Sequence, residues 1–260
     1  MAKSAAAAAS ILKDVRALLE ARADEKEAAK EGKSRSGAAQ PRSPLKALGV
    51  KTSSVRSIAR EIQTKNKPVM DYGAALALVD AAVSRKVREE ILVALDVLER
   101  YRKDFAPGLF SHVERWSSVA EDLEVAEALG ARVAAPALAL EPAKINVLRK
   151  WARLRSVGKR RLAVLASVGL VSEGRREAAT VLELAELLLH EDHPAMVSAV
   201  AGLLRETTKV DAKAVQDFLF RRSVDGNPDI LRAGSENLDA ARRAALIAKL
   251  EAQAAVVAAT

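Results

Sequence analysis

Hydrophobic residues recur every three or four positions along most of the chain, with charged residues between them. In residues 87–105, Ile91, Leu95 and Leu98 fall on one side of a helix and most of the charges fall on the other. The same spacing predicts a helix over residues 4–30. The remaining helices are predicted at about 52–62, 72–84, 108–114, 117–129, 143–156, 159–170, 175–190, 193–207, 211–222 and 228–250.

Glycine and proline residues lie between the predicted helices or at their edges, where helix breakers are expected. Helices joined by short turns are typical of an α-solenoid or an irregular bundle. About a dozen helices are too many for one bundle, so the pattern favours an all-α fold of HEAT-like helical repeats forming a curved α-solenoid. The composition agrees, because 50% of the residues are hydrophobic, only 3% are aromatic, and good helix formers dominate the core.

The composition divides the chain into three parts. Residues 1–40 comprise the first helix and a flexible basic link that contains Lys33 and Arg35. Residues 41–250 form the HEAT-like helical domain, and residues 251–260 form an alanine-rich tail.

The basic residues are clustered. The net charge is +8, and residues 144–161 contain eight Lys and Arg residues and no acid. Several of them begin a predicted helix, where cations oppose the helix dipole unless a polyanion binds there. An ordinary solvated face is the alternative, but the absence of acids favours a phosphate-binding ridge. Its candidate residues are Arg149, Arg153, Lys159, Arg160 and Arg161.

The chain lacks the residues for several kinds of chemistry. Without cysteine it has no disulfide, thiolate zinc site or cysteine nucleophile. No phosphate-binding glycine loop or nucleophile-elbow motif is present. His190 and His193 straddle a helix break at Pro194, which disfavours a metal site. No apolar run approaches the roughly 20 residues that span a bilayer. We therefore expect no metal, no cofactor, no membrane association and a monomeric protein.

Several segments resemble the AlkD-like DNA alkylation repair family, whose members are HEAT-like helical DNA glycosylases. The resemblance covers about residues 45–245. The matching segments are GVKTSSVRSIAREI (49–62), where serine replaces the family's proline, REEILVALDVLERYRKDF (88–105), Trp116 with the acidic helix after it, KRRLAVLA (159–166) and AVAGLLRETTKVDAKAVQDFL (199–219).

The resemblance implies a concave basic surface that binds duplex DNA carrying a cationic alkylpurine such as 3-methyladenine or 7-methylguanine. It also implies hydrolysis of the N-glycosidic bond. An aspartate near two tryptophans stabilises the sugar cation and positions water in this family. Arg161 falls on the family's DNA-contacting arginine.

Two alignments place the family's aspartate differently. Counting four residues from Trp116 places it on Ala120, where the carboxylate is missing. Aligning backwards from Gly130 places it on Asp122, and we prefer this register. An aspartate in a first helical turn is also explained by the helix dipole alone. The position of the second tryptophan is occupied by Gly202.

The sequence therefore predicts a DNA repair protein that binds double-stranded DNA with alkylated bases through residues 41–250 and acts as a DNA glycosylase. Asp122 is the candidate catalytic residue, Trp116 the candidate contact to the lesion, and the five basic residues above the candidate phosphate contacts. A non-catalytic binder of damaged or branched DNA is the first alternative, which Ala120 and Gly202 favour. A helical-repeat scaffold for another protein is the second. The expected location is the cytoplasm, at the nucleoid in a bacterium.

Overall fold

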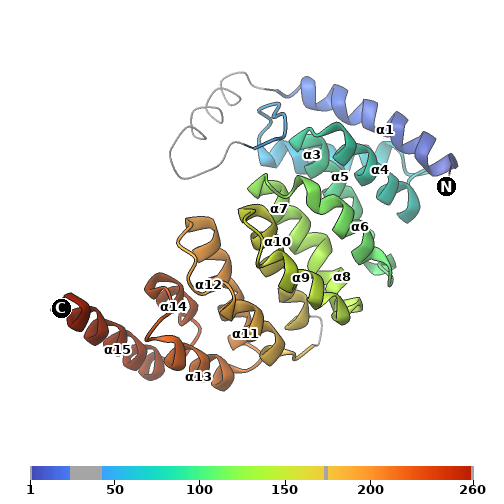
Figure 1. Ribbon diagram of the computed structural model, residues 1–260. Coiled ribbons are helices and arrows are strands. Elements are labelled where there is room, and N and C mark those ends of the chain that lie inside the picture. Colours follow the sequence, from blue (N-terminus) through green and yellow to red (C-terminus); the bar gives the residue numbers. More distant parts are fainter. Residues whose placement is uncertain (1, 24–42, 173–174, 259–260) are drawn as a thin grey trace. The chain divides into compact units, whose positions relative to one another are not determined.

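The computed structural model describes residues 2–23, 43–172 and 175–258 (Figure 1). Every regular element in these ranges is helical, apart from one isolated parallel bridge between Lys46 and Val87. The all-α prediction is therefore confirmed. No helix in the same ranges is both long and apolar enough to cross a membrane. Most of the predicted basic link, including Lys33 and Arg35, lies outside the described residues.

The first of two compact units comprises Met1–Val133. In this unit α3, α5 and α7 pack side by side in chain order, and α1 packs across α3, α4 and α5 (Figure 1). Its helices are α1 (Ala2–Glu20), α3 (Thr52–Lys65), α4 (Tyr72–Arg85), α5 (Arg88–Glu99), α6 (Leu109–Trp116) and α7 (Leu123–Leu129), with 3-10 turns η1 (Arg102–Asp104) and η2 (Ser117–Val119).

The second unit comprises Ala134–Thr260. Here α10, α12 and α14 pack side by side, α9 packs on α10, and α11 and α13 pack on α12. Its helices are α8 (Ala135–Leu140), α9 (Ile145–Trp151), α10 (Val157–Ser167), α11 (Ala178–Glu186), α12 (Pro194–Thr208), α13 (Ala212–Arg222), α14 (Pro228–Gly234) and α15 (Ala240–Ala258). Its 3-10 turns are η4 (Pro142–Lys144) and η5 (Val168–Leu170). The π-helical turn η3 (Gly130–Ala134) spans the boundary in the chain, and its residues 130–133 belong to the first unit.

In both units, alternate helices along the chain pack side by side, and the helices between them pack against this layer. This arrangement is the organisation of HEAT-like repeats, in which each helix pair buries its apolar face against the next. The predicted periodicity decides which faces are buried: Val55, Ile58 and Ile62 of α3 are all at most 2% exposed. The prediction of helical repeats is confirmed within each unit.

Two helices of the first unit end before the residue at which the hydrophobic pattern predicts their end. α1 ends at Glu20 instead of residue 30, and the chain turns immediately afterwards. α5 ends at Glu99 instead of residue 105. The hydroxyl of Tyr101 donates to the carbonyl oxygen of Met70 at 2.6 Å, a tertiary contact that holds the chain in the turn after α5.

The segment 228–250, predicted as one helix, forms two. α14 ends at Gly234, and the Oδ1 atom of Asp239 accepts a hydrogen bond from the backbone N–H of Arg242 at 2.9 Å at the start of α15. The break therefore follows a glycine, and the aspartate after it supplies a helix-start signal that divides the predicted helix. α8 lies where no helix is predicted, and its Pro136 occupies the first turn, where proline is tolerated.

Glu90 is a carboxylate in the core of the first unit. It is 0% exposed, and the Nε atoms of Arg16 and Arg85 each lie 3.2 Å from one of its oxygens. Burial raises the pKa of Glu90 above its ordinary value, although Arg16 and Arg85 act in the opposite direction. The folded state therefore binds a proton at Glu90 more tightly than the unfolded chain does.

A pH-dependent stability follows from this raised pKa. Because the folded pKa exceeds the unfolded one, the wild-type protein loses stability as the pH rises through the interval between them. Glu90→Gln removes this titration. We expect the free energy of unfolding of the wild type, relative to that variant, to fall as the pH rises above the ordinary glutamate pKa of about 4.5 in urea titrations. The exposed Glu251→Gln should show no such trend. A relative stability that rises with pH would mean that the two arginines outweigh burial.

Candidate functional site

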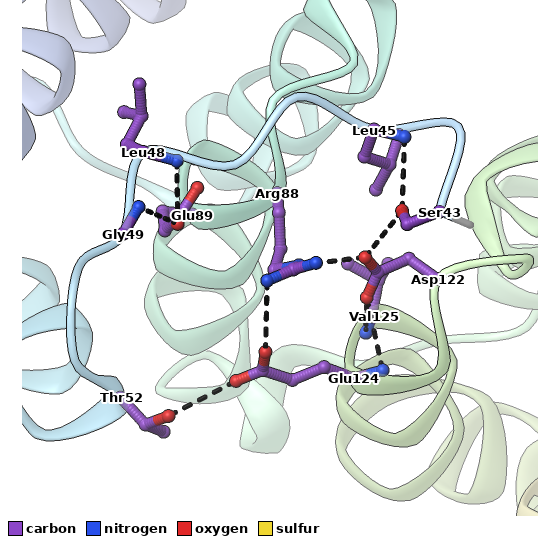
Figure 2. Close-up of polar contacts among 10 residues, drawn as sticks. All are labelled: Ser43, Leu45, Leu48, Gly49, Thr52, Arg88, Glu89, Asp122, Glu124 and Val125. Carbon is purple, nitrogen blue, oxygen red and sulfur yellow. Dashed lines mark hydrogen bonds and ion pairs between the residues drawn. The ribbon is translucent and has the colours of Figure 1, made fainter. Parts of the chain in front are cut away.

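Asp122 lies at the start of α7 and caps this helix (Figure 2). Its Oδ1 atom accepts hydrogen bonds from the backbone N–H groups of Glu124 and Val125, each at 3.1 Å. Its Oδ2 atom accepts from Nε of Arg88 at 2.8 Å and from Oγ of Ser43 at 2.7 Å. Aspartate is favoured at this position because it accepts from amides that have no partner within the helix.

Arg88 and Asp122 form a buried ion pair. The two side chains are 2% and 3% exposed. Nη1 of Arg88 also lies 3.9 Å from Oε2 of Glu124, and Oε1 of Glu124 accepts from Oγ1 of Thr52 at 3.2 Å. As Figure 2 shows, the pair is the centre of a polar network that joins α5, α7 and the residues before α3.

Glu89 extends this network along residues 43–51. Its Oε1 atom accepts from the backbone N–H groups of Leu48 and Gly49 at 2.9 and 3.0 Å. Gly49 has a φ of 74°, a left-handed conformation that favours glycine. The backbone of Lys46 also exchanges hydrogen bonds with residues 86 and 88 at the start of α5. The network therefore fastens an irregular segment to two helices.

The carboxylate of Asp122 is fully engaged in these contacts. A carboxylate has about four acceptor positions, and Asp122 accepts four hydrogen bonds. The arrangement stabilises helix α7, neutralises the buried Arg88 and orients Ser43. These are structural roles in the first unit.

Trp116 ends α6 and is buried. It is 1% exposed, its Nε1 donates to Oδ1 of Asp80 at 2.6 Å, and its ring centroid lies 5.3 Å from that of His112. Burial lowers the pKa of His112, as Arg115 also does, so the neutral imidazole is favoured beside the indole. Trp116 therefore holds α6 against α4 through Asp80, whereas the contacts of Asp122 come from α5 and residues 43–52.

The other two positions of the family comparison are also described. Ala120, which follows η2, is 0% exposed. Gly202 lies inside α12, and a Cβ atom built on it meets nothing closer than Nη2 of Arg205 at 3.8 Å. Neither position supplies a carboxylate or an aromatic ring.

The basic cluster lies on α9, on the turn formed by residues 152–156 and at the start of α10. α9 is shorter than the predicted helix 143–156, so Arg153 and Arg155 lie in the turn. Lys150, Arg153 and Arg155 are exposed, and Lys159 is half-buried. None of these four side chains forms an ion pair with an acid of the described residues.

Three other cations of the cluster have protein partners. Arg149 pairs with Glu183 of α11 at 2.6 Å. Arg160 is bound to Glu191, and its Nη1 donates to the carbonyl oxygens of residues 154 and 155 at 2.9 and 2.8 Å. Nη1 of Arg161 donates to the carbonyl oxygen of Ala195 at the start of α12. Arg160 and Arg161 therefore position the turn and the helices that carry the remaining cations.

Sequence reasoning located the cluster but omitted Lys150 and Arg155 from its candidate phosphate contacts. In a helix over 143–156, Arg155 would lie near the apolar side, but α9 ends at Trp151 and Arg155 lies in the exposed turn. The missed signal is Ser156, whose Oγ accepts from the backbone N–H of Lys159 at 3.0 Å and caps α10. No group of three or more potential metal-binding side chains occurs in the part of the chain that the structure describes.

These features define an all-α helical-repeat protein that carries a basic surface suited to a polyanion in its second unit. The sequence profile of the family described as DNA alkylation repair enzyme matches residues 15–238. The chain therefore belongs to this family, as the resemblance implied. A search of curated proteins found no match.

Proposed function

We propose that this protein acts in DNA alkylation repair by binding duplex DNA through Lys150, Arg153, Arg155 and Lys159, here named the phosphate ridge. The carrying observation is that these four cations lie together with no ion pair to a described acid. Such cations attract a polyanion, which releases its counterions when it binds. Membership of the family supports DNA as that polyanion.

Base excision by Asp122 is the second candidate function, and the family's description supports it. A carboxylate that assists excision must face the sugar cation that develops during the reaction. Asp122 is 3% exposed and accepts four hydrogen bonds within the protein. The geometry therefore favours binding of alkylated DNA over excision by this residue.

Salt dependence tests the phosphate ridge. We expect the logarithm of the affinity for a labelled duplex to fall with the logarithm of the salt concentration, with a slope of about −3 to −4 for four phosphate contacts. Fluorescence anisotropy at several salt concentrations measures this slope. Lys150→Ala/Arg153→Ala should make it shallower by about two units.

The matched control is Lys209→Ala/Lys213→Ala, because both lysines are exposed in the second unit and already pair with acids. It removes the same charge and should change the slope little. A flat salt dependence for the wild type, or equal effects of the two double variants, would reject the ridge.

Methylated duplex DNA tests excision separately. We expect the wild-type protein to bind it without releasing 3-methyladenine or 7-methylguanine faster than a reaction without protein. Chromatography of the released bases measures this. Release above that rate that a folded Asp122→Asn variant abolishes would instead establish Asp122 as the catalytic residue.

A further inference from the structure

A second basic site lies in the first unit, outside the phosphate ridge. It is a pocket of about 490 Å³ formed by α3, the C-terminal part of α5 and the π-helical turn η3. Four arginines and two acids line it: Arg56, Arg60, Arg100, Arg132, Asp96 and Glu99. The lining therefore has a formal excess of two positive charges.

Three of the four guanidinium groups in this pocket have no partner among the described residues. Arg56, Arg60 and Arg100 are exposed, and their guanidinium groups form no hydrogen bond or ion pair with a described residue. Arg56 and Arg60 also lie one turn apart on α3, where like charges repel each other. An anion between them would remove this repulsion.

The fourth arginine is held in place by the protein. Nη1 of Arg132 binds Oδ1 of Asp96, and its Nε lies 3.6 Å from Oε2 of Glu99. Arg132 lies on η3, and π-helical turns within helices are frequent at functional sites. Ion pairs that hold one arginine in position reduce the cost of ordering that side chain when an anion binds.

Asp96 itself opposes an anion less than an exposed acid does. It is 9% exposed, and its Oδ2 atom has no hydrogen-bond partner in the described structure. Burial, the largest contribution, raises the pKa of this carboxyl despite the neighbouring arginines. Asp96 therefore binds a proton more readily than an exposed aspartate does.

We propose that Arg56, Arg60, Arg100 and Arg132 form a phosphate-binding pocket in the first unit. Guanidinium groups bind phosphate oxygens through paired N–H donors, which makes arginine the preferred residue for this ligand. The pocket volume lies within the range of small-ligand sites, so a phosphate that belongs to a larger molecule fits. A second pocket of about 420 Å³ shares Arg56, Asp96 and Arg132 and provides room for the rest of that molecule.

The phosphate has two possible sources, a DNA backbone or a free phosphorylated compound. The first source rests on the proposed function and adds a second phosphate-binding locus to the ridge. The second is independent of DNA binding. Both require the same guanidinium groups, so one set of variants examines both.

The experiment uses the full chain and two probes, inorganic phosphate by titration calorimetry and a labelled duplex by anisotropy. Arg56→Ala/Arg60→Ala removes the two arginines of α3, and Arg56→Lys/Arg60→Lys keeps their charge but not their paired donors. The matched control is Lys67→Ala/Lys103→Ala, because both lysines are exposed in the same unit and do not line the pocket. Circular dichroism checks that each variant is folded.

We expect the wild type and the control to bind inorganic phosphate alike, and the alanine variant to lose about tenfold or more in affinity. The lysine variant should lie between them. If the phosphate is part of DNA, the alanine variant should also make the salt slope for the duplex shallower by about one or two units. An unchanged slope together with lost phosphate binding assigns the pocket to a free phosphorylated compound.

The proposal is overturned if the wild type binds no inorganic phosphate. It is also overturned if Arg56→Ala/Arg60→Ala and the control Lys67→Ala/Lys103→Ala change the phosphate affinity equally. Failure of the proposed function has a different signature. In that case the ridge variant Lys150→Ala/Arg153→Ala leaves duplex binding unchanged while phosphate binding still depends on Arg56 and Arg60.

Discussion

Arg88→Ala is expected to destabilise the first unit by about 3–5 kcal/mol, since removing one partner of a buried ion pair leaves the other charge uncompensated. The remaining charge is that of Asp122, which is 3% exposed. For a chain of this size the change corresponds to a fall in Tm on the order of 10 °C. Thermal unfolding followed by circular dichroism measures it.

Arg60→Ala is the matched control, because it removes an arginine of the same unit that is exposed and makes no ion pair with a described residue. Its stability should stay within about 0.5 kcal/mol of the wild type. The double variant Arg88→Met/Asp122→Asn should lose less than the sum of its single variants, because neither charge is then left alone. Equal stability of Arg88→Ala and Arg60→Ala would show that the network of Figure 2 does not hold residues 43–52.

This expected loss of stability affects how any loss of activity at Asp122 is interpreted. A substitution there breaks the cap of α7 and the pair with Arg88 at once. Reduced DNA binding or base release could then follow from partial unfolding alone. Activity of Asp122 variants is therefore informative only at temperatures where unfolding curves show them to be folded.

The helices that the sequence predicts best combine clear periodicity with a capping side chain. Residues 72–84 and 211–222 are predicted as helices, and α4 and α13 occupy Tyr72–Arg85 and Ala212–Arg222. Asp71 and Asp211 cap them by accepting from backbone N–H groups. Where a tertiary contact ends a helix, as Tyr101 does after α5, local sequence holds no comparable signal.

The candidate site also has one part that the local sequence predicts and one part that depends on the fold. A run of residues without acids is visible in the sequence, and it correctly indicates where basic side chains gather. Some of these cations form ion pairs with acids that lie more than 30 positions further along the chain. Glu183 pairs with Arg149, and Glu191 pairs with Arg160. Only the packing of α11 and the segment before α12 brings them close.

The pair formed by Arg88 and Asp122 shows the same limit more strongly. The capping role of Asp122 follows from its position before an apolar helical pattern, so the local sequence predicts it. Its ion pair to a residue 34 positions away and its hydrogen bond to Ser43, 79 positions away, depend on the fold. The family resemblance implies a catalytic role for Asp122, and the fold gives the same residue a structural role.

Gly169→Ala is expected to destabilise the second unit by about 2–3 kcal/mol or more, the upper part of the range for overpacking a core. A Cβ atom at this position would lie 1.9 Å from the carbonyl oxygen of Ala135 and 2.8 Å from its carbonyl carbon. Both are backbone atoms at the start of α8, so no side-chain rotation relieves the clash. Either η5 or α8 must move, and η5 directly follows α10, which carries part of the phosphate ridge.

Gly202→Ala is the matched control and should have the opposite sign. Gly202 lies in the interior of α12 with open space around its Cβ position, so alanine should stabilise the helix by about 0.5–1 kcal/mol. Urea unfolding of both variants measures the difference. An unchanged free energy of unfolding for Gly169→Ala would mean that η5 can move away from α8 at little cost. A stabilised Gly202→Ala, in contrast, would show that backbone packing does not require glycine at this position of α12.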